Sequence, residues 1–278
     1  MTYEKLWNRL CTVYDAGEAK AIVRMVLDER FGLSAADVYC GKVTQLSSDE
    51  QAELEKIMLR LEQAEPVQYV LGWANFCNRQ FSVSSGVLIP RPETEELCSW
   101  ITEDVGNRQQ PAILDIGTGS GCIAISLALD IKGSAVSAWD ISTDALRIAK
   151  ENAARLCADI NIMKQDALTP PQDANRWDVI VSNPPYICEK EKTEMERNVL
   201  DNEPAIALFV PDNDPLLFYH AIALYGTKAL KPKGMLFFEI NAAYAAETCN
   251  MLRQLGYVDV EARNDLFGKA RMVRACMG

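Results

Sequence analysis

The spacing of apolar residues separates the chain into a helical N-terminal part and a longer part with a different period. From about residue 2 to residue 63, apolar side chains recur at helical intervals. The clearest run is Ile22, Val23, Val26 and Leu27. Turn and cap residues at 14–17, 32–34 and 47–48 mark where these helices are expected to end or begin. We therefore predict a small helical domain at residues 1–72.

Alternating apolar and polar positions follow the helical part. Residues 73–76 and 80–83 flank Asn78-Arg79 and predict a short β-hairpin, which leads into the apolar run at 86–89. We interpret residues 73–90 as a connector between two domains.

From residue 91 to residue 278 short apolar strands alternate with helical stretches. The predicted strands are Ala112–Ile116, Ala135–Trp139, Val179–Val181 and Met235–Ile240. Such alternation predicts βαβ units and a parallel sheet that is covered on both faces. Two closing segments, Val258–Ala262 and Arg271–Ala275, stand on either side of Asn264–Lys269 and predict a terminal hairpin on one edge of that sheet. We assign residues 91–278 to a single α/β domain.

Composition and charge narrow the classes of function. The 278 residues are 49% hydrophobic and 24% charged, which is typical of an ordinary globular protein. A formal net charge of -11 repels phosphate backbones, so a protein partner is favoured over nucleic acid. The nine cysteines form no CxxC pair, and we expect reduced thiols in a cytosol and no metal site. Because no segment approaches the ~20 apolar residues of a membrane span, we expect no membrane partner.

A glycine-rich turn follows the first predicted strand. The segment Asp115-Ile116-Gly117-Thr118-Gly119-Ser120-Gly121 stands between this strand and a helical stretch that starts at Cys122. Glycines let the backbone approach a ligand closely, and the helix N-terminus that follows offers free N–H groups. A dinucleotide fingerprint would need its third glycine where Cys122 stands. The spacing resembles instead the GxGxG loop of class I methyltransferases.

Two acidic residues follow the next apolar segments. Asp140 ends a predicted strand, where a carboxylate is placed to hold both ribose hydroxyls of a nucleoside. Asp166 follows the apolar segment 160–163 and is expected to receive an adenine amino group. A glycine turn and strand-end carboxylates also occur as plain α/β scaffolding, but their ordered combination favours a cofactor site.

The strand Val179–Val181 runs directly into Ser182-Asn183-Pro184-Pro185-Tyr186. Parallel sheets bind ligands at the carboxyl ends of their strands. An amide nitrogen is a poor nucleophile because its lone pair is delocalised, so a site that methylates it must orient it. The prolines restrict the local backbone, and we expect the Asn183 side-chain oxygen and the Pro184 carbonyl to accept the N–H bonds of a substrate NH₂ group. Tyr186 is expected to stack on that flat group.

No strong general base is required for such a transfer. A methylated amide nitrogen carries positive charge, so its proton can leave to water. The single histidine, His220, falls in an apolar helical pattern and is interpreted as structural.

Asn-Pro-Pro-Tyr after a GxGxG loop resembles the amino methyltransferases that act on planar NH₂ groups, among which adenine and glutamine enzymes share this motif. The segment Leu88–Leu97, with the sequence LIPRPETEEL, looks like the signature of the peptide chain release factor N5-glutamine methyltransferase family. The resemblance runs through nearly the whole chain. It includes Glu203-Pro204 and a closing Asp265, Gly268 and Arg271.

This resemblance implies an α/β class I (Rossmann-like) methyltransferase fold with a mostly parallel seven-stranded sheet and a small N-terminal helical domain that recognises the substrate. It implies S-adenosylmethionine as cofactor and, as substrate, the glutamine of the Gly-Gly-Gln loop in class 1 peptide chain release factors. A cytoplasmic monomer without direct contact to nucleic acid is expected.

The site residues that the resemblance implies fall into two groups. For the cofactor they are Asp115, Gly117, Thr118, Gly119, Ser120, Gly121, Asp140, Asp166, Ala167 and Asn183. For the substrate and catalysis they are Asn183, Pro184, Pro185, Tyr186, Arg91 and Glu93. Two positions depart from the family's pattern: Ala167 stands where some relatives carry an aromatic residue, and Asn241 where glycine is frequent.

Other functions remain open at this point. Asn183–Tyr186 would also suit an N6-adenine methyltransferase of DNA or RNA that flips a base, although the acidic composition disfavours it. Ribosomal-protein glutamine methylation and cofactor binding without turnover are further alternatives. The charged stretch Glu189–Arg197 is interpreted as a solvated face, or alternatively as a border of the cleft that grips the release factor.

Overall fold

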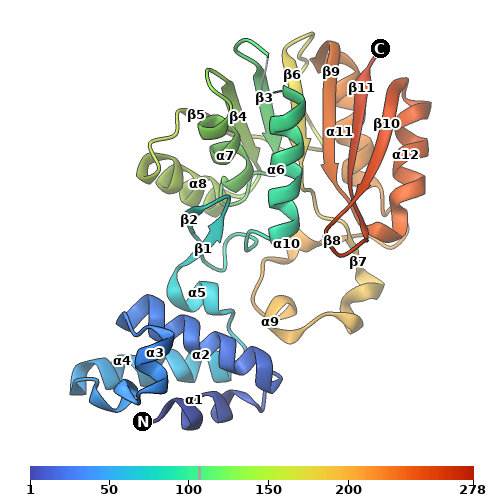
Figure 1. The fold of residues 1–278 in the computed structure, drawn as a ribbon. Helices are drawn as coiled ribbons and strands as arrows, with labels where there is room; N and C mark the ends of the chain where they lie inside the picture. The colour runs from blue at the N-terminus through green and yellow to red at the C-terminus, as the bar shows by residue number, and fades with distance from the viewer. Residues whose placement is uncertain (106–107) are drawn as a thin grey trace. The chain divides into compact units, whose positions relative to one another are not determined.

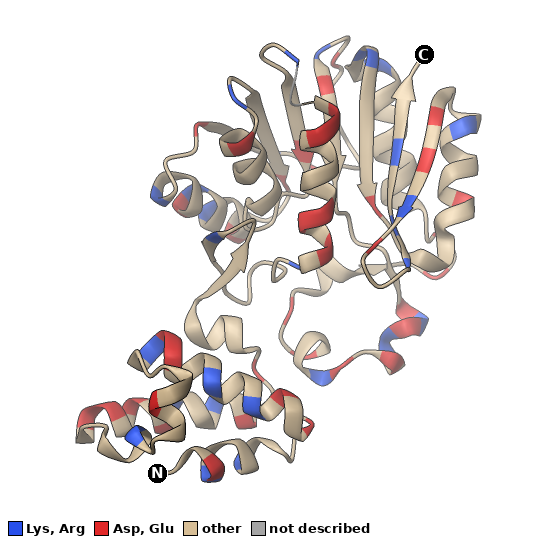
Figure 2. Ribbon diagram, in the orientation of Figure 1, with Lys and Arg blue, Asp and Glu red and all other residues tan. Residues whose placement is uncertain are grey.

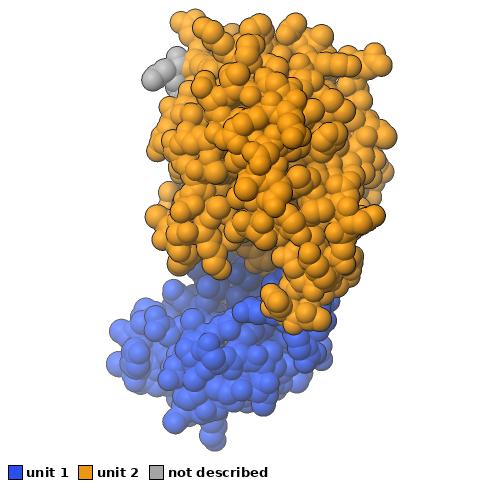
Figure 3. Space-filling model, turned by 90° about the vertical axis from the view of Figure 1, so that its right-hand side faces the viewer, with its two compact units in different colours: residues 1–73, 196–202 blue, residues 74–195, 203–278 orange. Residues whose placement is uncertain are grey.

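The computed structural model describes residues 1–105 and 108–278 (Figure 1). These residues form two compact units, which Figure 3 distinguishes by colour. Unit 1 contains residues 1–73 and 196–202, and unit 2 contains residues 74–195 and 203–278. Among the helices of the described ranges, none combines the length and apolar character that crossing a bilayer requires.

Unit 1 is helical. Its elements are α1 (Tyr3–Leu10), α2 (Ala16–Phe31), α3 (Ala35–Tyr39), the 3₁₀ helix η1 (Lys42–Gln45), α4 (Ser48–Glu62), α5 (Val67–Leu71) and α9 (Arg197–Leu200). The predicted helix boundaries are confirmed: the Asp15 side chain caps α2, Gly32 ends it with a φ of 64°, and Ser47 starts α4 through a capping box with Glu50. Apolar faces of α1, α2 and α4 share one core, which buries Leu10, Leu27 and Leu54 among others.

The predicted β-hairpin is present as β1 (Trp73–Phe76) and β2 (Arg79–Ser82). The two turn residues, Cys77 and Asn78, have φ values of 47° and 58°, as a tight two-residue hairpin turn requires. Phe76 and Phe81 are fully buried in a core cluster of unit 2, so the hairpin packs into that unit's core.

Unit 2 is built on a seven-stranded sheet with the order β10-β11-β9-β6-β3-β4-β5. Its strands are β3 (Ala112–Ile116), β4 (Ala135–Asp140), β5 (Ile160–Lys164), β6 (Trp177–Ser182), β9 (Leu230–Glu239), β10 (Tyr257–Asn264) and β11 (Ala270–Met277). The five strands from β9 to β5 pair in parallel, whereas β10 and β11 form an antiparallel hairpin along one edge. The predicted mostly parallel sheet and its terminal hairpin are therefore confirmed.

Helices cover both faces of this sheet. Their bounds are α6 (Pro92–Val105), α7 (Cys122–Asp130), α8 (Thr143–Arg155), α11 (Leu217–Ala229) and α12 (Ala245–Gln254). Alternate residues of β6 point to opposite sides: Val179 and Val181 pack with α6 and α7, and Ile180 packs with α11 and α12. In Figure 1, α6 lies in front of the sheet and α11 behind it.

The sequence pattern did not predict several short elements between β6 and α12. They are β7 (Ile187–Cys188), the 3₁₀ helix η2 (Glu189–Glu194), α10 (Ala205–Leu208), β8 (Phe209–Val210) and the 3₁₀ helix η3 (Ala242–Tyr244). Elements of two to six residues are too short to show a period of their own. β7 and β8 pair in parallel and form a separate small sheet.

Candidate active site

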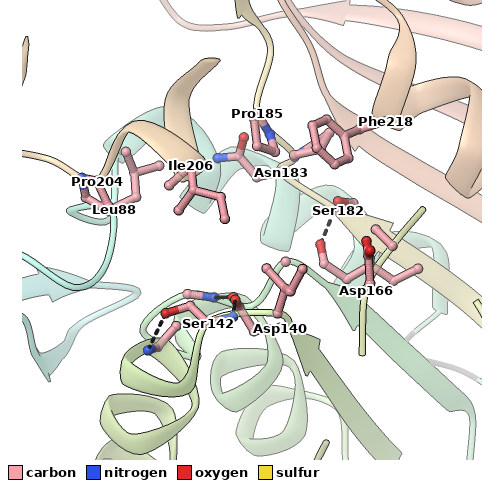
Figure 4. A pocket seen from close by; sticks show the side chains of 18 of the residues that line it. Leu88, Asp140, Ser142, Asp166, Ser182, Asn183, Pro185, Pro204, Ile206 and Phe218 are labelled. Carbon is pink, nitrogen blue, oxygen red and sulfur yellow. Dashed lines mark hydrogen bonds between the residues drawn. The ribbon is translucent and has the colours of Figure 1, made fainter. Parts of the chain in front are cut away.

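A cavity of about 280 Å³ opens in unit 2 where the parallel strands end (Figure 4). Such a position is expected, because loops that follow neighbouring parallel strands meet at one edge of the sheet. The cavity brings together residues from the ends of four strands. Of the predicted residues, Gly117, Gly119, Asp140, Asp166, Ala167, Asn183, Pro184 and Pro185 line it.

The glycine loop bends around the end of β4. The N–H groups of Gly117 and Thr118 both donate to the Trp139 carbonyl at 2.9 Å. Gly117 and Gly119 have φ values of 77° and 55°, and a Cβ added to either would meet no atom within 4 Å. The loop therefore leaves open space beside its backbone, which suits a close ligand.

Four other predicted loop residues do not line the cavity: Asp115, Thr118, Ser120 and Gly121. Thr118 donates from Oγ1 to Asp115 Oδ2 at 2.6 Å, and Gly121 caps the N-terminus of α7. Asp115 is fully buried, and burial raises its pKa to about 7, against the opposing effect of the Thr118 hydrogen bond. Within the described residues, Asp115 Oδ1 and Ser120 Oγ are buried without a partner.

Asn152 on α8 is a supporting residue that the sequence pattern did not predict. Its Nδ2 donates to the carbonyls of Ser82 and Ser120 at 3.0 and 2.9 Å, and its Oδ1 accepts from the Ser82 N–H at 2.7 Å. The side chain thus joins β2, α8 and the glycine loop. An available signal was its place on the apolar face of α8, between Ala149 and Ala153.

Asp140 is held in one orientation by the backbone. Its Oδ2 accepts from the Gly119 N–H at 2.9 Å and its Oδ1 from the Ser142 N–H at 2.8 Å. Burial raises the pKa of Asp140, and these hydrogen bonds oppose that rise. Figure 4 shows Asp140 and Asp166 at the cavity from neighbouring strand ends.

An apolar wall completes the part of the cavity near Asp166. Asp166 Oδ1 accepts from the Leu168 N–H at 2.8 Å. Phe218 and Ile222 of α11 line the same cavity as Ala167. Phe218 therefore supplies an aromatic ring from another element, where Ala167 supplies none.

The acceptor motif is fixed to both its neighbouring strand and a buried network. Ser182 Oγ donates to the Ile116 carbonyl at 2.6 Å, which ties the end of β6 to the end of β3. Asn183 Nδ2 donates to Thr94 Oγ1 at 3.3 Å, and Thr94 in turn donates to Glu239 Oε2 at 2.6 Å. Among the described residues, none donates to Asn183 Oδ1. Thr94 and Glu239 are each 2% exposed and were not predicted as site residues.

Tyr186 faces this network, and its side chain does not line the cavity. Its hydroxyl donates to Glu239 Oε1 at 3.2 Å. Burial raises the pKa of the Tyr186 hydroxyl, and the negative charge of Glu239 raises it further. Burial also raises the pKa of Glu239, while the Thr94 hydrogen bond and the Arg271 charge lower it. The proposed stacking of Tyr186 on a substrate stays a prediction.

Asn241, a departure from the family's pattern, has a structural explanation. Its Nδ2 donates to the Tyr186 carbonyl at 3.1 Å and to Glu191 Oε2 at 3.2 Å. Its Oδ1 accepts from the Ala243 N–H at 3.0 Å and so caps η3. A glycine at this position would lose these bonds, which connect the acceptor motif to the charged stretch.

Other predicted residues lie outside the cavity lining. Arg91 forms an ion pair with Glu203, whose Oε2 also accepts from the Ile89 N–H at 3.2 Å. Arg91 and Glu93 as substrate contacts stay predictions. His220 is solvent-exposed on α11 and does not line the cavity.

Two family models match the sequence. The model of the PrmC N-terminal domain matches residues 9–72, and that of the Methyltransferase small domain matches residues 94–204. A release factor glutamine methyltransferase of Bacteroides thetaiotaomicron is 48% identical over 264 residues, which cover 95% of this chain and 94% of that protein. A protein of the same name from Flavobacterium psychrophilum is 38% identical over 268 residues, again 95% and 94%.

A solved structure of a methyltransferase from Pyrococcus furiosus superposes with a TM-score of 0.52 at 14% identity and covers 84% of this chain and 100% of that one. At this identity the likeness shows the fold alone, which is the predicted class I methyltransferase fold.

Proposed function

The chain belongs to the release factor glutamine methyltransferase family, and on this premise we propose that it methylates the side-chain amide nitrogen of the glutamine in the Gly-Gly-Gln loop of class 1 release factors. The methyl donor is S-adenosylmethionine. We further propose that residues 1–72 recognise the factor, and that the enzyme works as a cytoplasmic monomer. The named relatives disfavour the adenine and ribosomal-protein alternatives.

The residues that line the cavity fit this cofactor. Gly117 and Gly119 leave room for a ligand against their backbone, and the oriented Asp140 carboxylate suits the two ribose hydroxyls. The ring of Phe218 and the apolar side chain of Leu168 suit the flat face of adenine, with the Asp166 carboxylate beside them. The Asn183 segment lines the same cavity, so the cofactor and the group to be methylated would share one cavity.

A one-way chain of hydrogen bonds carries the proposed mechanism. The Glu239 carboxylate accepts a hydrogen bond from the Thr94 hydroxyl, so Thr94 presents an oxygen lone pair to the Asn183 Nδ2 group. This hydrogen bond fixes which side of the Asn183 amide carries the nitrogen, and it leaves Oδ1 free to accept from the substrate. Oδ1 and the Pro184 carbonyl then bind the two N–H groups of the substrate glutamine, which prepares its nitrogen for attack.

When held by the glycine loop and Asp140, S-adenosylmethionine would supply an electrophilic methyl group; the amide nitrogen would take this group as the donor's sulfur–carbon bond breaks, with the bonding electrons left on sulfur. The positively charged amide nitrogen is held by Asn183 Oδ1 and the Pro184 carbonyl, which stabilise developing positive charge. Its extra proton leaves to water. The single histidine, His220, does not line the cavity, so the proposed mechanism does not use it as a base.

The proposed activity is tested with radiolabelled S-adenosylmethionine, purified class 1 release factors and peptide mapping of the methylated residue. Label on the glutamine of the Gly-Gly-Gln loop supports the proposal, and label on nucleic acid or on no macromolecule contradicts it. Asn183→Ala should still bind the cofactor, through the glycine loop and Asp140, and lose about a hundredfold or more in kcat.

The hydrogen-bond chain has its own matched pair of variants. Thr94→Val removes the hydroxyl and is expected to lower kcat about tenfold or more, whereas Thr94→Ser keeps the donor and should stay close to wild type. Melting temperatures show whether each variant is folded. Equal kcat values for the two folded variants would contradict the proposed orientation of Asn183.

A further inference from the structure

The turn between β10 and β11 exposes two large apolar side chains. Leu266 is 87% and Phe267 is 78% exposed, and in the described part of unit 2 these are the highest values for large hydrophobic residues. The next highest is Ile206 at 60%, and Ile206 lines the active-site cavity. Leu266 and Phe267 are neighbours in one turn, so these two most exposed apolar side chains of the unit lie together. Exposed apolar side chains that lie together are typical of a binding surface.

The turn is held in shape by polar contacts. The side chain of Asp265 is 1% exposed, and its Oδ1 accepts from the N–H groups of Phe267 and Lys269 at 3.0 and 2.9 Å. Gly268 takes a φ of 80° in the same turn. From α6, Glu96 Oε1 accepts the Leu266 N–H at 3.2 Å. A turn fixed in this way presents both side chains at a lower entropy cost on binding than a mobile loop would.

The strand register places this turn at the end of the sheet where the cavity-lining strands also end. Met272 of β11 pairs with Glu239 of β9, and the Ile240 N–H donates to the Arg271 carbonyl at 2.8 Å. Figure 1 shows the β10–β11 turn at the end of the sheet where β9 ends. Arg271 connects the two sites, since its Nε donates to Asp265 Oδ2 at 3.3 Å and its charge favours the Glu239 carboxylate.

We propose that Leu266 and Phe267 form a docking contact for the protein substrate, against an apolar surface of the release factor. This proposal rests on the proposed function. An aliphatic and a phenyl side chain gain free energy on binding by leaving water for an apolar surface. A nucleic acid is the poorer occupant, because α6, which contacts this turn, carries acidic residues along its length (Figure 2) and repels phosphate.

The test is steady-state kinetics of the full chain with a purified release factor. The double variant Leu266→Ser, Phe267→Ser is expected to raise KM for the factor about tenfold, which corresponds to about 1.4 kcal/mol. Affinity for S-adenosylmethionine and the melting temperature should stay at wild-type values, because neither side chain lines the cavity or a core cluster. Since the contact is apolar, the rise in KM should persist at high salt.

Val258→Ser is the matched control. Val258 is 47% exposed at the start of β10, the opposite end of the same hairpin, and this variant should keep the wild-type KM. Phe267→Leu, which keeps an apolar side chain, should lose less than the double variant.

A double variant with unchanged KM for the factor overturns the docking proposal, as does an equal rise in KM for Val258→Ser. Concentration-dependent dimerisation of the wild type that the double variant abolishes would assign the turn to a second copy of the chain, and would also overturn it. Failure of the function itself is distinguishable, because then the wild-type enzyme transfers no methyl group to any release factor.

Discussion

Two glycines of the cofactor loop can each be replaced by alanine. Comparing the two variants distinguishes the effect of the loop's backbone conformation from the effect of its packing. Gly119 has a φ of 55°, and an added Cβ meets no atom within 4 Å. Gly121 has a φ of 82°, and its added Cβ would lie 2.9 Å from Ile125 Cδ1 and 3.2 Å from Ala149 Cβ. The isoleucine end can move. Ala149 is less free to move, since its Cα on α8 would be 3.4 Å away.

The expected magnitudes follow from these contacts. The left-handed conformation costs either alanine about 1–2 kcal/mol, partly offset by the lower entropy of its unfolded chain. Overpacking adds about 1–3 kcal/mol for Gly121→Ala alone. At about 2–4 °C per kcal/mol for a domain of this size, Gly121→Ala should melt roughly 2–12 °C below Gly119→Ala.

Cofactor affinity should change in the opposite order. Gly119 lines the cavity, so its new methyl group takes space from the ligand, whereas the contacts of Gly121 are with α7 and α8. Calorimetric titration with S-adenosylmethionine should therefore show about a tenfold or greater loss of affinity for Gly119→Ala, and a smaller one for folded Gly121→Ala. Equal melting temperatures for the two variants would refute the packing part of this reasoning.

Two further predictions concern buried polar groups. Asn152→Ala should lower the free energy of unfolding in urea by about 2–4 kcal/mol, because it leaves the Ser120 carbonyl and the Ser82 backbone groups unpaired; a loss below about 1 kcal/mol would contradict this. Burial raises the pKa of Asp115 from 3.8 to about 7, so the folded state holds this proton more tightly. Its stabilising contribution is complete below about pH 4 and is lost as the pH rises through about 7, by at most about 4 kcal/mol. Asp115→Asn should thus show a smaller loss of stability than wild type between about pH 5 and pH 8, and identical pH slopes would contradict that.

Local sequence patterns predicted the sheet and the position of the cavity well. A strand that is buried on both faces, such as Val179–Val181, and a glycine turn before a helix leave signals within a few residues. Because parallel strands end at a common edge, these local signals also predict that the glycine loop, Asp140 and Asn183 meet. The cavity lining confirms that arrangement.

The supporting contacts could not be predicted in the same way. Thr94, Asn183 and Glu239 come from three distant segments, and only the fold determines which hydroxyl or carboxylate faces the Asn183 amide. The positions of Arg91 and Tyr186 show the same limit. The motif identified both residues, but the folded chain turns Arg91 to Glu203 and the Tyr186 hydroxyl to Glu239, outside the cavity lining.

Burial of Glu239 supports its proposed role in orienting Asn183 over a role in stability. A carboxylate that is 2% exposed pays a large desolvation cost, and an apolar side chain of similar size would commonly make a fold equally or more stable. Its two oxygens are occupied by the hydroxyls of Thr94 and Tyr186, which both belong to segments of the predicted site. An apolar residue would leave the Thr94 hydroxyl free to rotate and to donate toward Asn183. In the proposed mechanism, the Asn183 amide could then flip and present N–H groups, in place of an oxygen, to the substrate NH₂. The buried charge is therefore best explained by the fixed donor direction that it imposes on Thr94.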